Sequence, residues 1–163
     1  TLRSRRSAAA PPGRRGPPST ATSATVTIQE EPPLSVTPSS SALSGTYTVS
    51  GQVVTVTYDK PCKVGYLSGG KYVAAPAVAS GSGYAFTLPD GITEAILVVK
   101  GDVNGDGKIN IADVNRLFRY TSKKEITLSD EQYFAADVNL DKKVNIADVN
   151  RLFRFTTKQI TTL

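Results

Sequence analysis

A stretch of nineteen residues occurs twice in this chain, and its repetition constrains the fold more than any other feature of the sequence. Residues 102–120 read DVNGDGKINIADVNRLFRY, and residues 137–155 read DVNLDKKVNIADVNRLFRF. Fifteen of the 19 positions are identical, and the segment NIADVNRLFR is unchanged. Two copies of one pattern at a fixed offset of 35 residues predict two copies of one structural unit.

Side-chain oxygen occurs at positions 1, 3, 5, 9 and 12 of a twelve-residue segment at the start of each copy. With a backbone carbonyl at position 7, this spacing surrounds a hard cation such as calcium with the roughly six to eight oxygens that it prefers. We therefore predict two calcium ions, one in each loop; an Asp- and Asn-rich turn without an ion is the weaker alternative, because the pattern occurs twice. The predicted ligands are Asp102, Asn104, Asp106, the carbonyl of Lys108, Asn110 and Asp113 in the first loop, and Asp137, Asn139, Asp141, the carbonyl of Lys143, Asn145 and Asp148 in the second.

The two loops differ at position 6, where the chain turns sharply with a positive φ. Gly107 occupies this position in the first loop, and Lys142 occupies it in the second. A residue with a Cβ atom costs about 1 kcal/mol in this conformation, so we expect the second loop to bind calcium more weakly or with more strain. Without metal, the carboxylates of one small loop repel each other, and we therefore expect calcium binding to drive folding.

Each loop is followed by a predicted amphipathic helix. At about 100° per residue, the apolar positions fall in one arc, which we predict to be buried, and the outer arc contains mostly polar residues. Because the outer residues are the same in both copies, the sequence favours a binding face that is present twice; a recent duplication is the alternative. The predicted core contains Val114, Leu117, Phe118 and Thr121 with Val149, Leu152, Phe153 and Thr156, and the predicted outer face contains Ala112, Asn115, Arg116 and Arg119 with Ala147, Asn150, Arg151 and Arg154, bordered by Ile111 and Ile146.

The order of these elements resembles that of a known family. Ser129, with Gln132 three residues later, has the pattern of a capping box and predicts a short helix over residues 130–136, whereas no helix is predicted before the first loop. With the motif DVNGDG.IN..D and its second copy, the segment from Gly101 to Gln159 resembles a type I dockerin, a duplicated calcium-binding F-hand repeat. The resemblance implies an all-α dockerin with two EF-hand-like calcium loops.

The resemblance also implies a function. Type I dockerins bind cohesin modules of scaffoldins or cell-surface proteins, so the chain is expected to anchor a secreted bacterial protein that degrades carbohydrate in an extracellular, cellulosome-like complex. Two equivalent faces related by a pseudo-twofold axis imply that the same cohesin docks in two orientations, one at a time. Many type I members carry Ser-Thr before the last loop acid, where this chain carries Ile-Ala, a more apolar pair. The implied partner-binding residues are Ile111, Ala112, Asn115, Arg116, Leu117 and Arg119, and Ile146, Ala147, Asn150, Arg151, Leu152 and Arg154.

The remainder of the chain divides into two parts of different composition. Residues 1–44 are rich in Pro, Ser, Thr, Ala and Arg without a helical or strand period, so we predict a disordered tail or linker. Residues 45–99 contain five or six short β-branched runs separated by turn residues, including Gly69-Gly70, and predict a small all-β, sandwich-like accessory module. We expect this module to act as a spacer before the dockerin at residues 100–163; sugar binding is the alternative.

Composition excludes several classes of function. The chain has no histidine, which removes the usual general base and the Ser-His type of triad, so we expect a non-catalytic chain with any catalytic domain upstream of residue 1. No apolar run is long enough for a membrane span, and a single cysteine allows no internal disulfide. The basic excess comes from five arginines in residues 1–18 without interleaved aromatic residues, so nucleic-acid binding is not expected.

One further alternative stays open, namely a calcium-binding or sensor module without a cohesin partner. Sensors open paired helices to expose a groove, whereas here the first loop lacks an entering helix and the chain has no methionine. We therefore expect a monomer that binds a cohesin when it is loaded with calcium. Residues 100–163 contain 11 basic and 9 acidic residues, and two calcium ions would raise the net charge from +2 to about +6, which favours a partner with an acidic rim.

Overall fold

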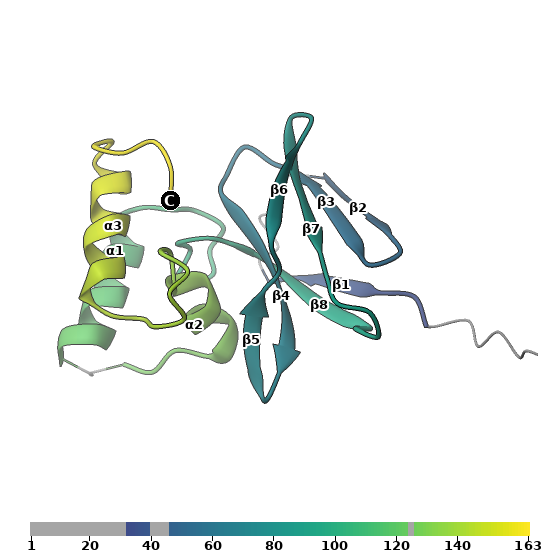
Figure 1. Ribbon diagram of the computed structural model, residues 1–163. Helices are drawn as coiled ribbons and strands as arrows, with labels where there is room; N and C mark the ends of the chain where they lie inside the picture. The colour runs from purple at the N-terminus through teal and green to yellow at the C-terminus, as the bar shows by residue number, and fades with distance from the viewer. Residues whose placement is uncertain (1–31, 40–45, 124–125) are drawn as a thin grey trace, which may run out of the picture. The chain divides into compact units, whose positions relative to one another are not determined.

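The structure is a computed structural model that describes residues 32–39, 46–123 and 126–163. Within these residues, eight β-strands are followed by helices, so the predicted order of an all-β region and an all-α region is confirmed (Figure 1). The tail predicted over residues 1–44 lies outside the described residues, except for 32–39. The strands are β1 (Ser35–Pro38), β2 (Thr46–Ser50), β3 (Val53–Thr57), β4 (Cys62–Ser68), β5 (Lys71–Ala74), β6 (Ala77–Ser80), β7 (Gly83–Thr87) and β8 (Glu94–Val99), and the helices are α1 (Ile111–Phe118), the π-helical turn η1 (Arg119–Lys123), α2 (Asp130–Ala136) and α3 (Ile146–Thr156).

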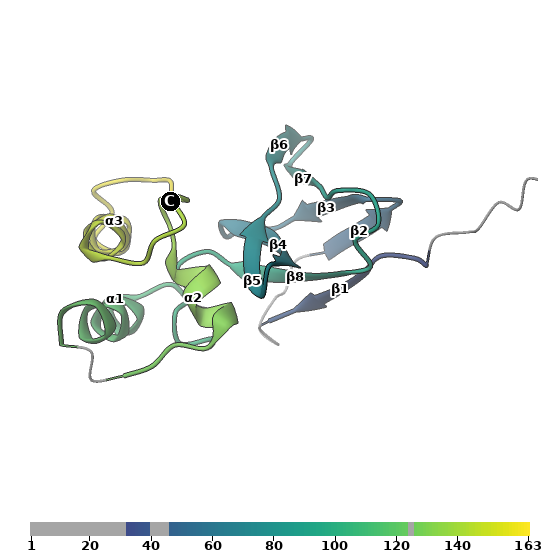
Figure 2. The same cartoon turned by 60° about the horizontal axis from the view of Figure 1, so that its bottom comes forward.

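The strands form two four-stranded sheets that enclose one apolar core (Figure 2). The first sheet has the order β1-β8-β4-β5, and the second has the order β2-β3-β7-β6. Val54 and Val56 of β3 and Phe86 of β7 are buried together with Val64 of β4 and Leu97 of β8. Because side chains from both sheets fill the core, removal of their apolar surface from water stabilises the predicted sandwich-like arrangement.

The sandwich is larger than the sequence indicated. Seven strands lie within residues 45–99, where five or six were expected, and β1 precedes them in the segment that was assigned to the tail. β1 pairs in parallel with β8, so that Ser35 lies opposite Glu94. Backbone hydrogen bonds to β8 hold this edge strand, and its four residues end in a proline, so local sequence pattern does not reveal it.

The hairpin between β4 and β5 agrees with the prediction. Gly69 and Gly70 have φ angles of 61° and 77°, and both therefore adopt the left-handed conformation that a tight two-residue hairpin turn requires. The hairpin fixes the position of β4, which contacts the helical region.

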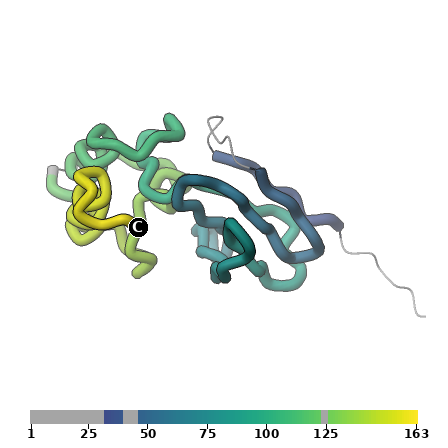
Figure 3. Tube along the Cα trace, turned by 90° about the horizontal axis from the view of Figure 1, so that it is seen from above, coloured from purple at the N-terminus to yellow at the C-terminus, as the bar shows by residue number. Residues whose placement is uncertain are grey.

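The helical region begins directly after the last strand. The chain leaves β8 and enters the first loop without an intervening helix, as expected (Figure 3). α2 begins and ends where the sequence predicted. The predicted capping box is also present, because the Gln132 N–H donates to Ser129 Oγ at 3.2 Å and the Ser129 N–H donates to Gln132 Oε1 at 3.1 Å.

α1 and α3 pack against each other through a narrow apolar stripe, with Leu117 and Leu152 fully buried. Phe118 and Phe153 were predicted in the same core, but their side chains are 42% and 43% exposed. The predicted arc was too wide: each phenylalanine follows the buried leucine, and a rotation of about 100° per residue turns it out of the contact between two helices. The other buried members of this core are Val103, Val114, Ala136 and Val149.

The helical region and the β region belong to one compact unit and share a second apolar core. Phe134 and Ala135 of α2 are buried together with Ile96 and Val98 of β8. Gly65 of β4 lies so close to the Phe134 ring that a Cβ atom at this position would be 2.5 Å from the nearest ring carbon. The β region is therefore packed against the helices.

Candidate calcium loops and helix faces

The carboxylate at position 1 organises the first loop. Asp102 Oδ1 accepts hydrogen bonds from the N–H groups of Gly105 (2.7 Å) and Asp106 (3.1 Å), and Asp102 Oδ2 accepts one from Gly107 (2.7 Å). Three backbone donors thus fold the loop around one carboxylate, and the glycines at positions 4 and 6 have φ angles of 80° and 78°. Only residues without a Cβ atom adopt this backbone readily.

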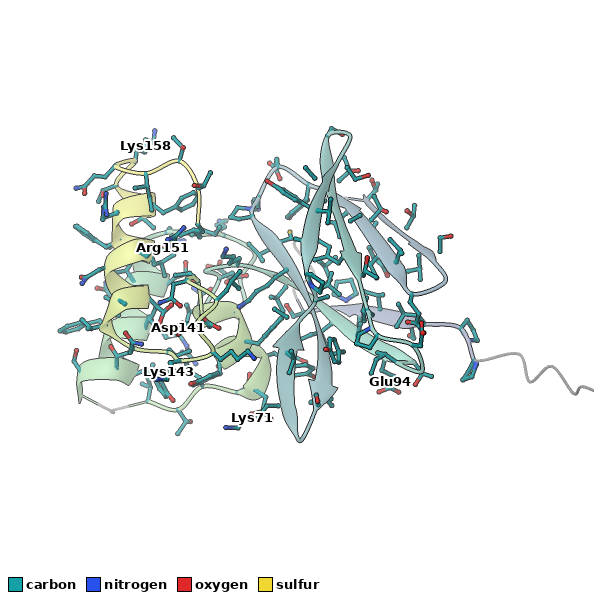
Figure 4. The ribbon with its side chains drawn as sticks, in the orientation of Figure 1. Lys71, Glu94, Asp141, Lys143, Arg151 and Lys158 are labelled. Atoms are coloured by element: carbon teal, nitrogen blue, oxygen red, sulfur yellow. The ribbon has the colours of Figure 1, made fainter. Side chains whose placement is uncertain are left out.

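The side chains at positions 3 and 5 are held by the backbone two residues further along. Asn104 Oδ1 accepts from the Asp106 N–H at 3.0 Å, and Asp106 Oδ1 accepts from the Lys108 N–H at 2.9 Å. These local bonds give alternate residues a fixed direction within the loop. The second loop repeats them at 2.9 and 2.8 Å with Asn139, Asp141 and Lys143, of which Asp141 and Lys143 are labelled in Figure 4.

The acid at position 12 joins the start of the loop to the start of the helix. Asp113 is fully buried, and its Oδ1 accepts from the N–H groups of Val103 (2.9 Å) and Asn104 (3.1 Å), while its Oδ2 accepts from Asn110 (2.9 Å). Asn110 caps the helix by accepting the Ala112 N–H at 2.7 Å. The equivalent bonds of the second loop involve Asp148, Val138, Asn139, Asn145 and Ala147.

Burial governs the electrostatics of both loops. It raises the pKa of Asp102, Asp113 and Asp148 above the ordinary value of an aspartate, and backbone N–H donors oppose this shift. A buried carboxylate is disfavoured in its charged form, so a bound cation would stabilise each of these groups. The second loop also has a basic neighbour, because Lys63 of β4 is buried, with its pKa lowered by burial to about 8 and the Asp137 carboxylate opposing that shift.

The second loop has a more strained turn than the first. Leu140 and Lys142 occupy positions 4 and 6 with φ angles of 64° and 67°, although both carry a Cβ atom. Asp137 Oδ2 accepts only the Lys142 N–H at 3.1 Å, and Asp137 Oδ1 is buried without a hydrogen-bond partner. Comparison of the two copies predicted the strain at Lys142 but missed the strain at Leu140, although Leu140 also stands opposite a glycine of the first copy, Gly105.

The orphaned oxygen of Asp137 supports a fit between the loop and a cation. A buried carboxylate oxygen without a hydrogen-bond donor is costly, and a carboxylate oxygen is a hard ligand of the kind that calcium prefers. In the described ranges, no three carboxylate, imidazole or thiolate groups form a metal cluster by themselves. The predicted ligand set therefore depends on amide and backbone carbonyl oxygens in addition to aspartates.

The outer helix faces are closely matched in exposure. Ile111 and Ile146 are 53% and 51% exposed, and the exposed fractions of Phe118 and Phe153 are 42% and 43%. Ala112 and Asn115, like Ala147 and Asn150, are exposed on the same faces. Both faces therefore combine exposed apolar side chains with polar neighbours.

Four residues of the predicted faces lie elsewhere or differ between the copies. Leu117 and Leu152 are fully buried between the helices and are not available to a partner, which corrects their assignment. Arg116 is half-buried, and its Nη2 donates to Gln132 Oε1 at 3.3 Å, whereas Arg151 is exposed on α3 (Figure 4). The remaining arginines, Arg119 and Arg154, are exposed.

Two oxygen-lined loops, each followed by a helix and with no helix between β8 and the first loop, define a duplicated module of the calcium-loop type. The family model of the dockerin type I domain matches residues 100–155, and this part of the chain is a dockerin type I domain preceded by a β-sheet region. Type I dockerins bind calcium, and the domain implies a cohesin-binding module of cellulosome components, which are generally extracellular.

Among curated proteins, no relative of the chain was found. The dockerin domain and the β region are the parts identified, and neither supplies a catalytic domain in the described residues. No helix within those residues is long and apolar enough to cross a membrane.

Proposed function

We propose that the dockerin binds two calcium ions and attaches a secreted, polysaccharide-degrading protein to a cohesin of a scaffoldin. The observation that carries this proposal is the presence of two helix faces with the same sequence and nearly equal exposure, each starting from an oxygen-lined loop. We assign residues 100–163 to the dockerin, which acts as a monomer, and the residues from β1 to β8 to its accessory module.

Calcium would order the part of each helix that faces the partner. The docking pair Ile111 and Ala112 lies between two predicted ligands, Asn110 and Asp113. Asn110 caps the helix, and the Asp113 side chain accepts backbone N–H groups from the beginning of the loop. An ion held by these groups therefore fixes the first turn of α1, and the same argument applies to α3.

The proposed ligands are those predicted from the spacing of the loops. They comprise carboxylates, amides and the carbonyls at position 7. In the second loop, a bound ion would stabilise Asp137 Oδ1 most, because this oxygen is buried without a hydrogen-bond partner. The lysine side chains at position 7 are exposed, so only their carbonyls serve as ligands.

Docking in two orientations follows from the matched faces. The proposed contacts on the first face are Ile111, Ala112, Asn115, Arg116, Phe118 and Arg119, and those on the second are Ile146, Ala147, Asn150, Arg151, Phe153 and Arg154. The two phenylalanines replace the two leucines of the initial assignment, because the phenylalanines are the exposed side chains.

Calorimetric titration against a panel of cohesins tests the proposal. We expect binding of one cohesin per chain in calcium, loss of binding in excess EGTA, and recovery when calcium is restored. Melting and cohesin capture that are both unchanged by EGTA would overturn the assignment.

A further inference from the structure

Two lysines of the β region reach the backbone of the two loops. Lys60 Nζ donates to the Gly107 carbonyl at 2.6 Å, and Lys63 Nζ donates to the Asp137 carbonyl at 2.7 Å. The first contact is made at position 6 of the first loop, and the second at position 1 of the second loop. The β region therefore contacts both predicted calcium loops directly.

Lys63 differs from Lys60 in its surroundings. Its side chain is only 3% exposed, and its Nζ lies 4.3 Å from the centre of the Phe134 ring. Lys60 is partly exposed, so water screens its charge more strongly. Burial of an ammonium group is unfavourable unless it has partners of opposite charge or polarity, and Lys63 is attracted by the carboxylates of Asp137 and Asp148.

The second loop needs such a partner more than the first. Its position 1 carboxylate receives one backbone N–H, whereas the equivalent Asp102 receives three. Its turn also carries Leu140 and Lys142 in left-handed backbone. The ammonium of Lys63 supplies positive charge near the Asp137 carboxylate, which the backbone of this loop satisfies poorly.

We propose that Lys63 is a positioning residue of the second calcium loop, acting as an internal counter-cation that holds the loop folded before calcium binds. This inference rests on the proposed calcium role of the loop. The same charge opposes the incoming divalent ion, because like charges repel across a partly buried site. Lys63 thus makes the folding of the second loop less dependent on calcium, and it lowers the affinity of this loop for the ion.

Melting temperatures of the full chain at pH 7, in excess calcium and in excess EGTA, test this role. We expect Lys63→Met to lower the melting temperature in EGTA by several degrees more than in calcium, which widens the gap between the two conditions. Calcium titration of the Lys63→Met variant should show that one of the two sites binds calcium roughly tenfold more tightly than in the wild type. The matched control Lys71→Met removes an exposed lysine of β5 (Figure 4) and should leave the gap unchanged.

Lys63→Gln keeps a polar donor without the charge, and it serves as the test if Lys63→Met does not fold in either condition. Lys60→Met should change the gap less than Lys63→Met, because its charge is partly in water. Equal losses in calcium and EGTA would mean that Lys63 only supports the fold, and a narrower gap would mean that it aids calcium binding; either result overturns the inference. If the melting temperature of the wild type is the same in calcium and in EGTA, the proposed calcium function fails as well. The wild type therefore distinguishes failure of the proposed function from failure of the role of Lys63 alone.

Discussion

At the scale of single residues, the two loops show how the same ligand residue behaves on two different backbones. Asp102 accepts three backbone N–H groups, whereas Asp137 accepts one and leaves an oxygen buried without a donor. The difference accompanies the replacement of two glycines by Leu140 and Lys142, both at positive φ. Strain in the turn and weak satisfaction of the carboxylate therefore occur together in the second loop.

Relief of this strain is measurable with one substitution. Lys142→Gly should stabilise the protein in calcium by about 1 kcal/mol, because a residue without a Cβ atom adopts the left-handed conformation without steric cost. Calorimetric melting in calcium measures the change. Lys143→Gly is the control, because this substitution also removes a lysine, but at a position without a positive φ. It should not stabilise the protein, and equal effects of the two variants would contradict the assignment of strain to position 142.

Residue roles were predictable where they depend on local spacing. Lys142 was identified because a glycine stands at the same position of the first copy. The role of Lys63 was not identified, although a lysine inside the largely apolar β4 was a visible signal, because its partner Asp137 lies 74 positions away. A hydrogen bond across such a separation is set by the packing of the two regions and has no local sequence pattern.

At the scale of elements, α1 and α3 carry two matched faces, which we propose as docking faces. Replacing both apolar anchors of one face, by Ile111→Asp with Phe118→Ser, should weaken cohesin binding only about twofold, because one of two equivalent orientations is lost. The same pair of changes on α3, Ile146→Asp with Phe153→Ser, should have an equal effect. All four substitutions together should abolish binding measured by calorimetry.

All four side chains are exposed, so the variants should keep their fold, and equal melting temperatures in calcium are the control. Loss of all binding after the changes on α1 alone would rule out docking in two orientations. Equal, moderate losses that do not combine would place the cohesin contact elsewhere on the molecule.

Elements with a strong local signal were predicted to the residue, and others were not. α2 has a capping box and was placed correctly, whereas β1 has only the backbone of β8 to hold it. The helix ends also differ between the copies: α1 gives way to a π-helical turn after Phe118, but α3 continues as an α-helix to Thr156. Because both stretches have the sequence NRLFR at this point, the segments that follow them decide where each α-helix ends.

At the scale of the whole molecule, the β region and the dockerin are joined by an apolar core as well as by the two lysine contacts. α2 covers β8, and the Phe134 ring occupies the space above Gly65. The sequence predicted two regions in the correct order, but it did not predict their shared core, because nothing in the local pattern indicates which strand a helix will cover. The shared core implies that loss of one region lowers the stability of the other.

Gly65 is the position at which this coupling is most directly tested. A Cβ atom at Gly65 would lie 2.5 Å from the Phe134 ring, so Gly65→Ala should destabilise the protein by about 1–3 kcal/mol through overpacking. The shorter side chain of Phe134→Leu leaves room for the methyl group, and Gly65→Ala should therefore cost less in that background. Denaturant melts of the wild type, both single variants and the double variant give the interaction energy. Additive losses would show that the ring and the glycine are not in contact, and that the two regions fold without reference to each other at this point.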